Sequence, residues 1–216
     1  MSGRAWKVPV ALAATIVGAF VARRAFGRVE EPPFERLGAR DGLEVRRYGT
    51  VVVAETDVEG PYARAANEGF RRLAGYIFGG NRSKSSIPMT APVGMRSQGE
   101  RIAMTAPVAM VALPGDAPRW TMTFAMPAGL TLESAPTPLD ARVRLRAVPM
   151  RMVAVWSFPG KMSEELIVAQ RAELSARLRA AGFEPRGPIE LAQYNQPWIP
   201  GPWRRNELIV PIDELR

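Results

Sequence analysis

Two different periods of hydrophobic and polar positions appear in the first half of the chain. Residues 43–48 alternate with a period of two, and residues 50–58 form a run rich in β-branched side chains; both patterns are typical of strands. Residues 62–78 instead repeat their apolar positions at helical spacing. The apolar positions of this segment are Ala66, Phe70, Leu73 and Ile77. The pattern predicts a helix that ends at Gly79.

The same order of elements returns in the second half. Residues 148–158 form an apolar run that predicts a strand, and Ser163 is a suitable N-cap for a helix that ends at Gly182. A final strand is predicted over residues 207–212. Because each helix needs a sheet face to cover its apolar stripe, two strand–helix–strands units in tandem predict a pseudo-duplicated α+β domain.

The first 28 residues differ from the rest. Residues 8–22 carry no charge, and basic residues lie directly on both sides of them. Fifteen helical residues span roughly 22 Å, which is short of the ~30 Å hydrocarbon core, but Trp6 and the flanking basic residues extend that reach. A membrane anchor, a cleaved signal peptide and a packed soluble helix all agree with this pattern. No clear A-x-A cleavage site follows.

A pair of prolines at 32 and 33 marks the boundary of the globular part. We therefore divide the chain into residues 1–28 as a membrane anchor or signal segment, residues 29–33 as a linker, and residues 34–213 as one domain. We expect a membrane-anchored protein with its domain on the periplasmic side, or a protein secreted after signal cleavage. Both flanks of the apolar segment are positive, so charge leaves the orientation open.

Composition excludes several kinds of chemistry. The chain contains neither histidine nor cysteine, which excludes disulfides, thiolate zinc sites, cysteine nucleophiles and Ser–His–Asp triads. Residues 1–28 hold five basic and no acidic residues, so they account for five of the eight net positive charges. The remaining charge is ordinary for a globular domain, and no basic stripe is interleaved with aromatics. We expect no nucleic-acid partner.

An internal repeat is the most specific motif of the sequence. Residues 87–95 read IPMTAPVGM, and residues 102–110 read IAMTAPVAM. Each copy predicts a short extended segment, and Pro92 or Pro107 places it at an edge or a bulge. The simplest interpretation is two β segments that pack Met and Val inward. Methionine also forms an adaptable surface for a large flat ligand.

Several motifs in register resemble the SOUL haem-binding protein family over residues 34–212. They are residues 43–48 (LEVRRY), 75–81 (GYIFGGN), both copies of the repeat, 120–127, 193–197 (QYNQP) and 204–207 (RRNE). The resemblance implies a distorted β-barrel, or paired antiparallel sheets, flanked by two helices and built from two βαβ-type repeats. It is similar in plan to gyrase-inhibitor-like ligand-binding domains. The implied activity is non-covalent binding of haem or another tetrapyrrole, without catalysis.

The resemblance also implies a place for the ligand, against the helix over residues 62–78. Its candidate contacts are Arg64, Arg71 and Arg72 for the propionates, with Phe70, Ala74 and Ile77 as an apolar wall. The apolar residues equally suit a core, and the arginines equally suit a solvated face. With no His or Cys, any axial ligand of haem iron is a Met, Tyr, Lys or water. Loose carriage by stacking and ion pairs is the expected mode.

Other functions agree with parts of the sequence. A binding module for hydrophobic or drug-like cations would be favoured by an inward-facing Glu173 or Glu190. An enzyme acting on a tetrapyrrole has no support in the residues, and the Met150-Arg-Met152 sequence is a weak signal for thioether copper binding.

Two further segments have a structural and a functional interpretation. The Arg204-Arg205-Asn206-Glu207 run predicts either an anchor for ligand carboxylates or a network that fixes the last strand. Trp198 and Trp203 stand among prolines and suggest a stiff aromatic loop at the rim of a pocket.

Overall fold

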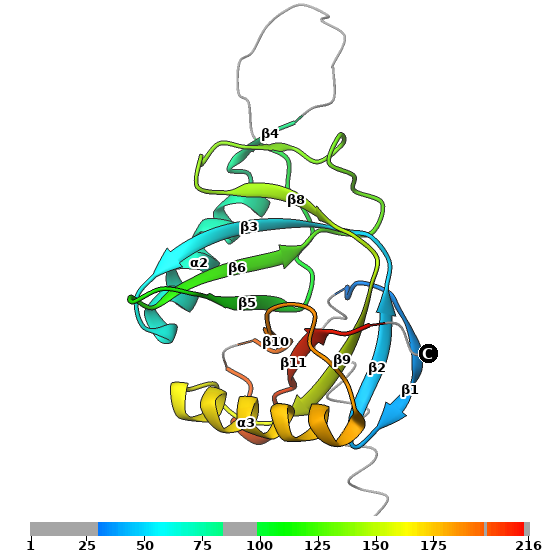
Figure 1. Cartoon of the computed structure of the whole chain (residues 1–216). Helices are drawn as coiled ribbons and strands as arrows, with labels where there is room; N and C mark the ends of the chain where they lie inside the picture. Colours follow the sequence, from blue (N-terminus) through cyan, green and yellow to red (C-terminus); the bar gives the residue numbers. More distant parts are fainter. Residues whose placement is uncertain (1–29, 84–98, 197, 214–216) are drawn as a thin grey trace, which may run out of the picture. The chain divides into compact units, whose positions relative to one another are not determined.

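The computed structural model describes residues 30–83, 99–196 and 198–213. Residues 1–30 and 31–216 are separate units, and the helices and strands belong to the second. Among the described residues, nine strands form one antiparallel sheet in the order β1-β2-β9-β11-β10-β5-β6-β3-β8 (Figure 1). A short pair, β4 (Asn81–Arg82) and β7 (Thr137–Pro138), lies apart from it. The strands of the large sheet are β1 (Phe34–Arg40), β2 (Leu43–Tyr48), β3 (Val51–Glu59), β5 (Val108–Leu113), β6 (Arg119–Ala125), β8 (Arg144–Val148), β9 (Arg151–Phe158), β10 (Glu190–Gln193) and β11 (Asn206–Pro211).

The same succession of elements occurs twice along the chain. The first unit is β2-β3-α2-β5-β6 and the second is β8-β9-α3-β10-β11, where α2 is Tyr62–Ile77 and α3 is Glu164–Ala181. Strands β3, β5 and β6 of the first unit are neighbours in the sheet, and so are β9, β10 and β11 of the second. The two units join where β5 pairs with β10. The first strand of each unit crosses to the other: β2 pairs with β9, and β8 pairs with β3. Each unit therefore contributes an outer strand to its counterpart.

The prediction of a distorted β-barrel is wrong. Closure requires β1 to pair with β8, and the described strands contain no such pairing. The reason lies in the edges themselves, because short strands that carry charges resist further pairing. The strand β8 has five residues, two of them arginine, and β1 has three charged residues and an irregular register near Gly38. A single open sheet results, instead of a barrel or two paired sheets.

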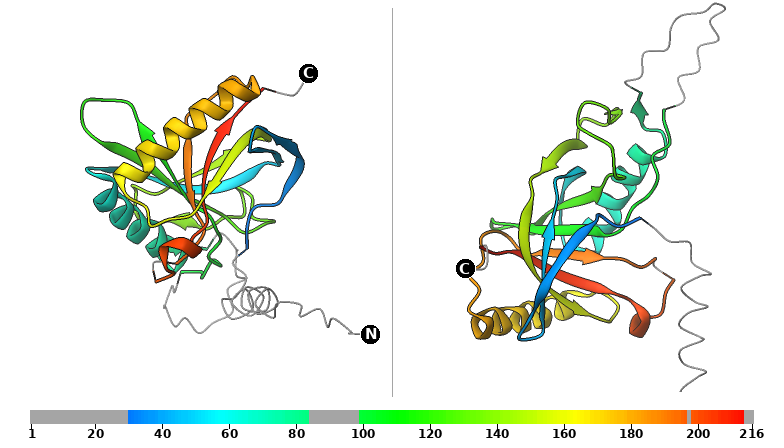
Figure 2. Two further views of the ribbon diagram at one scale, coloured as in Figure 1. Left: turned by 90° about the horizontal axis from the view of Figure 1, so that it is seen from below. Right: turned by 90° about the vertical axis from the view of Figure 1, so that its right-hand side faces the viewer.

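Both helices cover the same face of the sheet, one on each half (Figures 1 and 2). The alternation of β3 shows this: Val52, Ala54 and Val58 join the main core beneath α2. The helix lies close to β6 because Gly69 faces Met122, where an added Cβ would be 3.0 Å from the sulfur. A smaller apolar cluster lies on the opposite face, formed by Val153, Val155, Ala192 and Ile209 with Tyr48 and Tyr194 against it.

The helix boundaries agree with the sequence prediction to within one residue. Ser163 accepts a hydrogen bond from the amide of Leu166 at 3.2 Å, and Gly182 ends α3 in the left-handed conformation with φ of 70°. The start of α2 has a partner that the sequence did not indicate. The carboxylate of Glu164, in the first turn of α3, accepts a hydrogen bond from the Tyr62 amide at 3.0 Å. One acidic side chain thus links the N-terminal ends of both helices.

Other expectations differ from the structure or lie outside it. The strand predicted over residues 148–158 begins at Arg151, because Val148 ends β8 and residues 149–150 connect β8 to β9. The second copy of the repeat leads into β5, which begins at Val108 directly after Pro107, as a proline that cannot donate to the ladder requires. The first copy and residues 1–28 lie outside the described residues. Among the helices that are described, none is long and apolar enough to cross a bilayer.

Candidate functional site

The outer face of α2 carries an apolar stripe. Phe70, Ala74 and Phe78 follow one another at intervals of four residues, which places them on one side of a helix. Phe70 is 39% exposed and Phe78 is 57% exposed. The Phe70 ring rests edge-on against Phe124 of β6, with their centroids 5.4 Å apart. Phe124 is buried, so the sheet supports the stripe from below.

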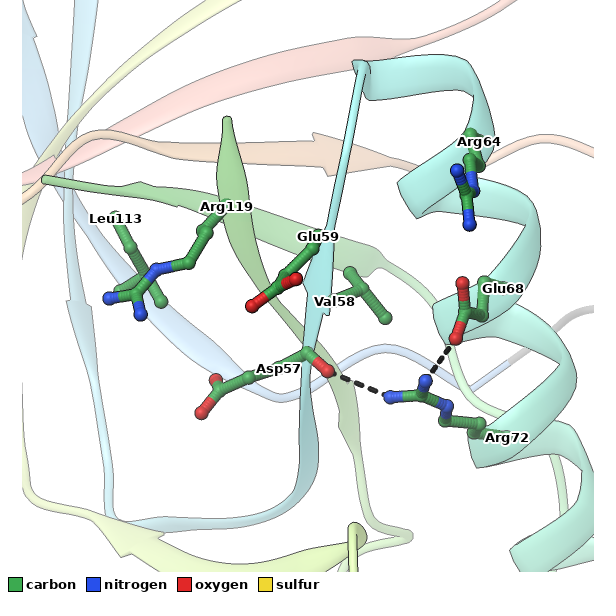
Figure 3. Close-up of a pocket in the computed structure, with 8 residues that line it drawn as sticks. All are labelled: Asp57, Val58, Glu59, Arg64, Glu68, Arg72, Leu113 and Arg119. Carbon is green, nitrogen blue, oxygen red and sulfur yellow. Dashed lines mark hydrogen bonds and ion pairs between the residues drawn. The ribbon is translucent and has the colours of Figure 1, made fainter. Parts of the chain in front are cut away.

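The three predicted arginines of α2 occupy different environments. Arg72 donates to the carbonyl oxygen of Asp57 at 2.8 Å and pairs with Glu68, one turn earlier (Figure 3). Its guanidinium therefore binds the backbone of β3 at Asp57, beyond the last β3 residue that pairs with β8. Arg71 is exposed, and its side chain donates a weak hydrogen bond of 3.4 Å to the Asn67 carbonyl. Arg64 is also exposed.

A polar cavity of about 360 Å³ lies between α2 and the end of β3. Arg64 and Arg72 line it together with Arg119, and three carboxylates face them (Figure 3). The carboxylates are those of Asp57, Glu59 and Glu68. Because the opposite charges are equal in number, this cavity has no excess of positive charge for a dianionic ligand. It also lies on the other flank of α2 from the Phe70–Phe124 contact.

The remaining predicted contact, Ile77, is 1% exposed and belongs to the main core. Its carbonyl oxygen accepts a hydrogen bond from the Ile102 amide at 2.8 Å, which brings the second copy of the repeat to the C-terminal end of α2. Two residues later, Met104 is partly exposed, and then Thr105 donates to the carbonyl of Ala125. The structure thus leaves one methionine of the repeat partly exposed, two residues after the contact with the end of α2.

A second cavity, of about 70 Å³, lies on the sheet face opposite the helices. It sits between the β2–β3 and β8–β9 connections, and its lining is mainly apolar. Glu190 lines this cavity, as the hypothesis of a binding module for hydrophobic cations required. Arg151 donates two hydrogen bonds to the Glu190 carboxylate, so its negative charge is already paired with a positive charge of the protein.

The Arg204–Glu207 run forms a structural network. Glu207 is 1% exposed and accepts hydrogen bonds from Arg46 at 2.9 and 3.0 Å. Asn206 donates to the carbonyl of Gly160 at 2.9 Å, and Arg204 donates to that of Ile199 at 2.7 Å. These contacts fix the start of β11. Neither Trp198 nor Trp203 lines either cavity described above.

Comparison with known proteins decides the family. The family model described as "SOUL heme-binding protein" matches residues 29–211. The chain belongs to the SOUL haem-binding protein family. No protein of curated function matches this SOUL chain.

Solved structures share the fold of this SOUL domain. The C-terminal domain of EcmrR has a TM-score of 0.57 at 8% identity, and the alignment covers 80% of this chain and 98% of that domain. A hydrolase encoded by lin2189 from Listeria innocua has a TM-score of 0.52 at 14% identity, with 82% and 94% covered. At such low identity the similarity concerns the fold alone.

The residues around the α2 stripe suit a tetrapyrrole. Two exposed aromatic rings on one helix face offer a flat apolar surface, and Arg71 lies next to them on the same helix. The SOUL chain has no His or Cys for iron, and among the described residues Met104 is a partly exposed methionine that follows the contact of Ile102 with the end of α2. Among the described residues, no three acidic side chains gather in a possible metal site. Sequence reasoning missed Phe78, although its spacing of eight from Phe70 would have indicated it.

Proposed function

We propose that the protein binds haem or another tetrapyrrole non-covalently, as a carrier or buffer, on the outer face of α2. The observation that carries the proposal is the exposed Phe70–Ala74–Phe78 stripe. Exposed aromatic residues on one helix face are costly to leave in water, and a flat apolar ligand would cover them. Membership of the SOUL family supports this ligand class.

We assign the following roles to residues on this face of α2. Phe70, Ala74 and Phe78 stack against the macrocycle, and Arg71 binds a propionate. Arg64 lines the charge-balanced cavity on the other flank of α2, so we assign it no role in this site. Arg72 and Ile77, which the sequence also suggested, hold the structure together and are left out of this site.

Titration with two ligands tests the mode of binding. Because the chain has no His or Cys, planar stacking and ion pairs provide the affinity, and metal-free protoporphyrin should bind nearly as well as hemin. Quenching of tryptophan fluorescence measures both dissociation constants. A preference for hemin above about tenfold, which equals about 1.4 kcal/mol, would show that iron coordination carries the binding.

A matched pair of variants tests the location. Phe78→Ser removes an exposed ring from the stripe and should raise the dissociation constant by about tenfold. Val168→Ser removes an exposed apolar side chain from α3 and should leave the affinity unchanged. Equal affinities of the two variants would place the ligand elsewhere on the domain.

A further inference from the structure

The loop between β10 and β11 exposes two tryptophans. Trp198 is 67% exposed and Trp203 is 78% exposed. We call residues 198–203 the tryptophan loop. An exposed indole leaves a large apolar surface in water, and two within six residues form a local patch. Since neither ring lines a described cavity, the proposed tetrapyrrole site leaves this patch unexplained.

The backbone of the tryptophan loop is firmly held, so the exposure of the rings follows from an ordered conformation. The amide of Trp203 donates to the Pro200 carbonyl at 3.0 Å, and Gly201 accepts a hydrogen bond from the Gly160 amide at 3.0 Å. Pro200 and Pro202 restrict the backbone further. The loop therefore presents its indoles outward on a stiff base.

The tryptophan loop lies beside the place where the chain enters the domain. Arg205, two residues after Trp203, forms an ion pair with Glu31 at 2.5 Å. The nine residues 23–31 span at most about 32 Å when extended. If residues 8–22 enter a bilayer, as the sequence predicts, the Glu31–Arg205 ion pair can lie no farther than this from the membrane surface.

The charges around the tryptophan loop suit a phospholipid surface. Lys161 is exposed and its backbone lies against Gly201, and Arg204 and Arg205 follow the loop directly. Acidic residues near the loop are engaged. Glu31 pairs with Arg205, and Glu164 accepts a hydrogen bond from the Tyr62 amide. Glu207, which lies 3.9 Å from Arg205, is buried and bound by Arg46. Basic side chains beside exposed indoles are the combination that binds headgroup phosphates and the interfacial region of a bilayer.

We propose that the tryptophan loop is a membrane contact, in which Trp198 and Trp203 enter the lipid interface and the neighbouring basic residues face the phosphates. The loop then fixes the orientation of the domain on the bilayer. This contact is separate from the tetrapyrrole site, so each proposal stands or fails by its own experiment.

A site-directed fluorescence experiment tests the contact in the full-length chain. The natural sequence has no cysteine, so Trp203→Cys and Trp198→Cys each provide a single site for an environment-sensitive nitrobenzoxadiazole label. Leu139→Cys is the matched control, since Leu139 is also exposed and apolar. The Leu139 amide donates a hydrogen bond to the Gly80 carbonyl, so this control site lies beyond the C-terminal end of α2. The tryptophan loop lies near the opposite end, because the side chain of Gln193, which precedes the loop, donates to the hydroxyl of Tyr62 at the start of α2. The 16 residues of α2 separate the two by about 24 Å.

The labelled proteins are reconstituted with phosphatidylcholine–phosphatidylglycerol vesicles, with and without a nitroxide-labelled phospholipid. We expect a blue shift and quenching by the nitroxide lipid at positions 198 and 203, and neither effect at position 139. Equal responses at 203 and 139 would overturn the proposal even if the protein floats with the vesicles. Failure of the full-length protein to float with the vesicles would overturn it as well. Thermal unfolding of each variant verifies that the loop substitutions leave the domain folded.

Discussion

At the scale of single residues, several polar side chains converge on the buried carboxylate of Glu207. Its carboxylate accepts hydrogen bonds from Arg46, from the Tyr194 hydroxyl at 2.5 Å and from Ser157 at 3.3 Å. Removing one partner of such a buried pair leaves the other charge without compensation. Arg46→Ala should therefore lower the free energy of unfolding by about 3–5 kcal/mol.

Urea denaturation measures this loss, and Arg36→Ala is the control. Arg36 is exposed and its contact with Glu44 is 3.6 Å, so its removal should cost less than about 1 kcal/mol. Similar losses in the two variants would show that the Arg46–Glu207 pair contributes no more than a surface contact.

The tyrosines predict how stability depends on pH. Burial raises the pKa of Tyr62 and of Tyr76 to about 12, and burial is also the largest cause of the raised pKa of Tyr48 and Tyr194. When the pKa of a tyrosine is higher in the folded than in the unfolded state, its neutral form contributes to stability, and this contribution is fully present below the unfolded pKa of about 10. It is lost as the pH rises from about 10 through about 12. The chain has only three lysines, so few other groups titrate in this range.

Urea denaturation at pH 8 and pH 11 checks this dependence. We expect a lower free energy of unfolding at pH 11, and a smaller difference in Tyr76→Phe than in the natural chain. A difference that is the same in both proteins would mean that ionisation of Tyr76 does not contribute.

At the scale of elements, α2 combines a buried face with an exposed apolar stripe. Leu73 is fully buried and Phe70 is about two fifths exposed. Leu73→Ala should cost about 2–5 kcal/mol of stability, as in a core, whereas Phe70→Ala should cost about 1–2 kcal/mol because its ring remains partly in water. Thermal unfolding of the two variants checks the order. A larger loss in Phe70→Ala would mean that the ring belongs to the core.

At the scale of the whole molecule, the membrane segment remains a prediction from the sequence. Full-length protein should be recovered in the membrane fraction, and a variant without residues 1–28 should be soluble and folded, because residues 8–22 are charge-free. Fractionation followed by mass spectrometry checks both. An unprocessed full-length chain in the soluble fraction would contradict the anchor, and a shorter soluble product would support signal cleavage.

The local elements of the domain could be predicted from the pattern of residues alone. The period of the apolar residues predicted both helices, and Ser163 and Gly182 marked the ends of α3. Helix caps and hydrophobic periodicity depend on residues that are close together in the sequence, so they can be recognised without knowledge of the fold. Two units in the same order also indicated the duplication.

How the elements combine, and which side chains remain exposed to a ligand, depends on contacts between distant parts of the chain. The exchange of β2 and β8 between the two units depends on pairings between distant strands, and Arg46 meets Glu207 across 161 residues. The same holds on α2, where Arg72 is engaged by the edge of β3 and Ile77 by the core, while Phe70 stays partly exposed. Burial depends on what packs against a residue from elsewhere in the chain, and a linear pattern does not contain that information.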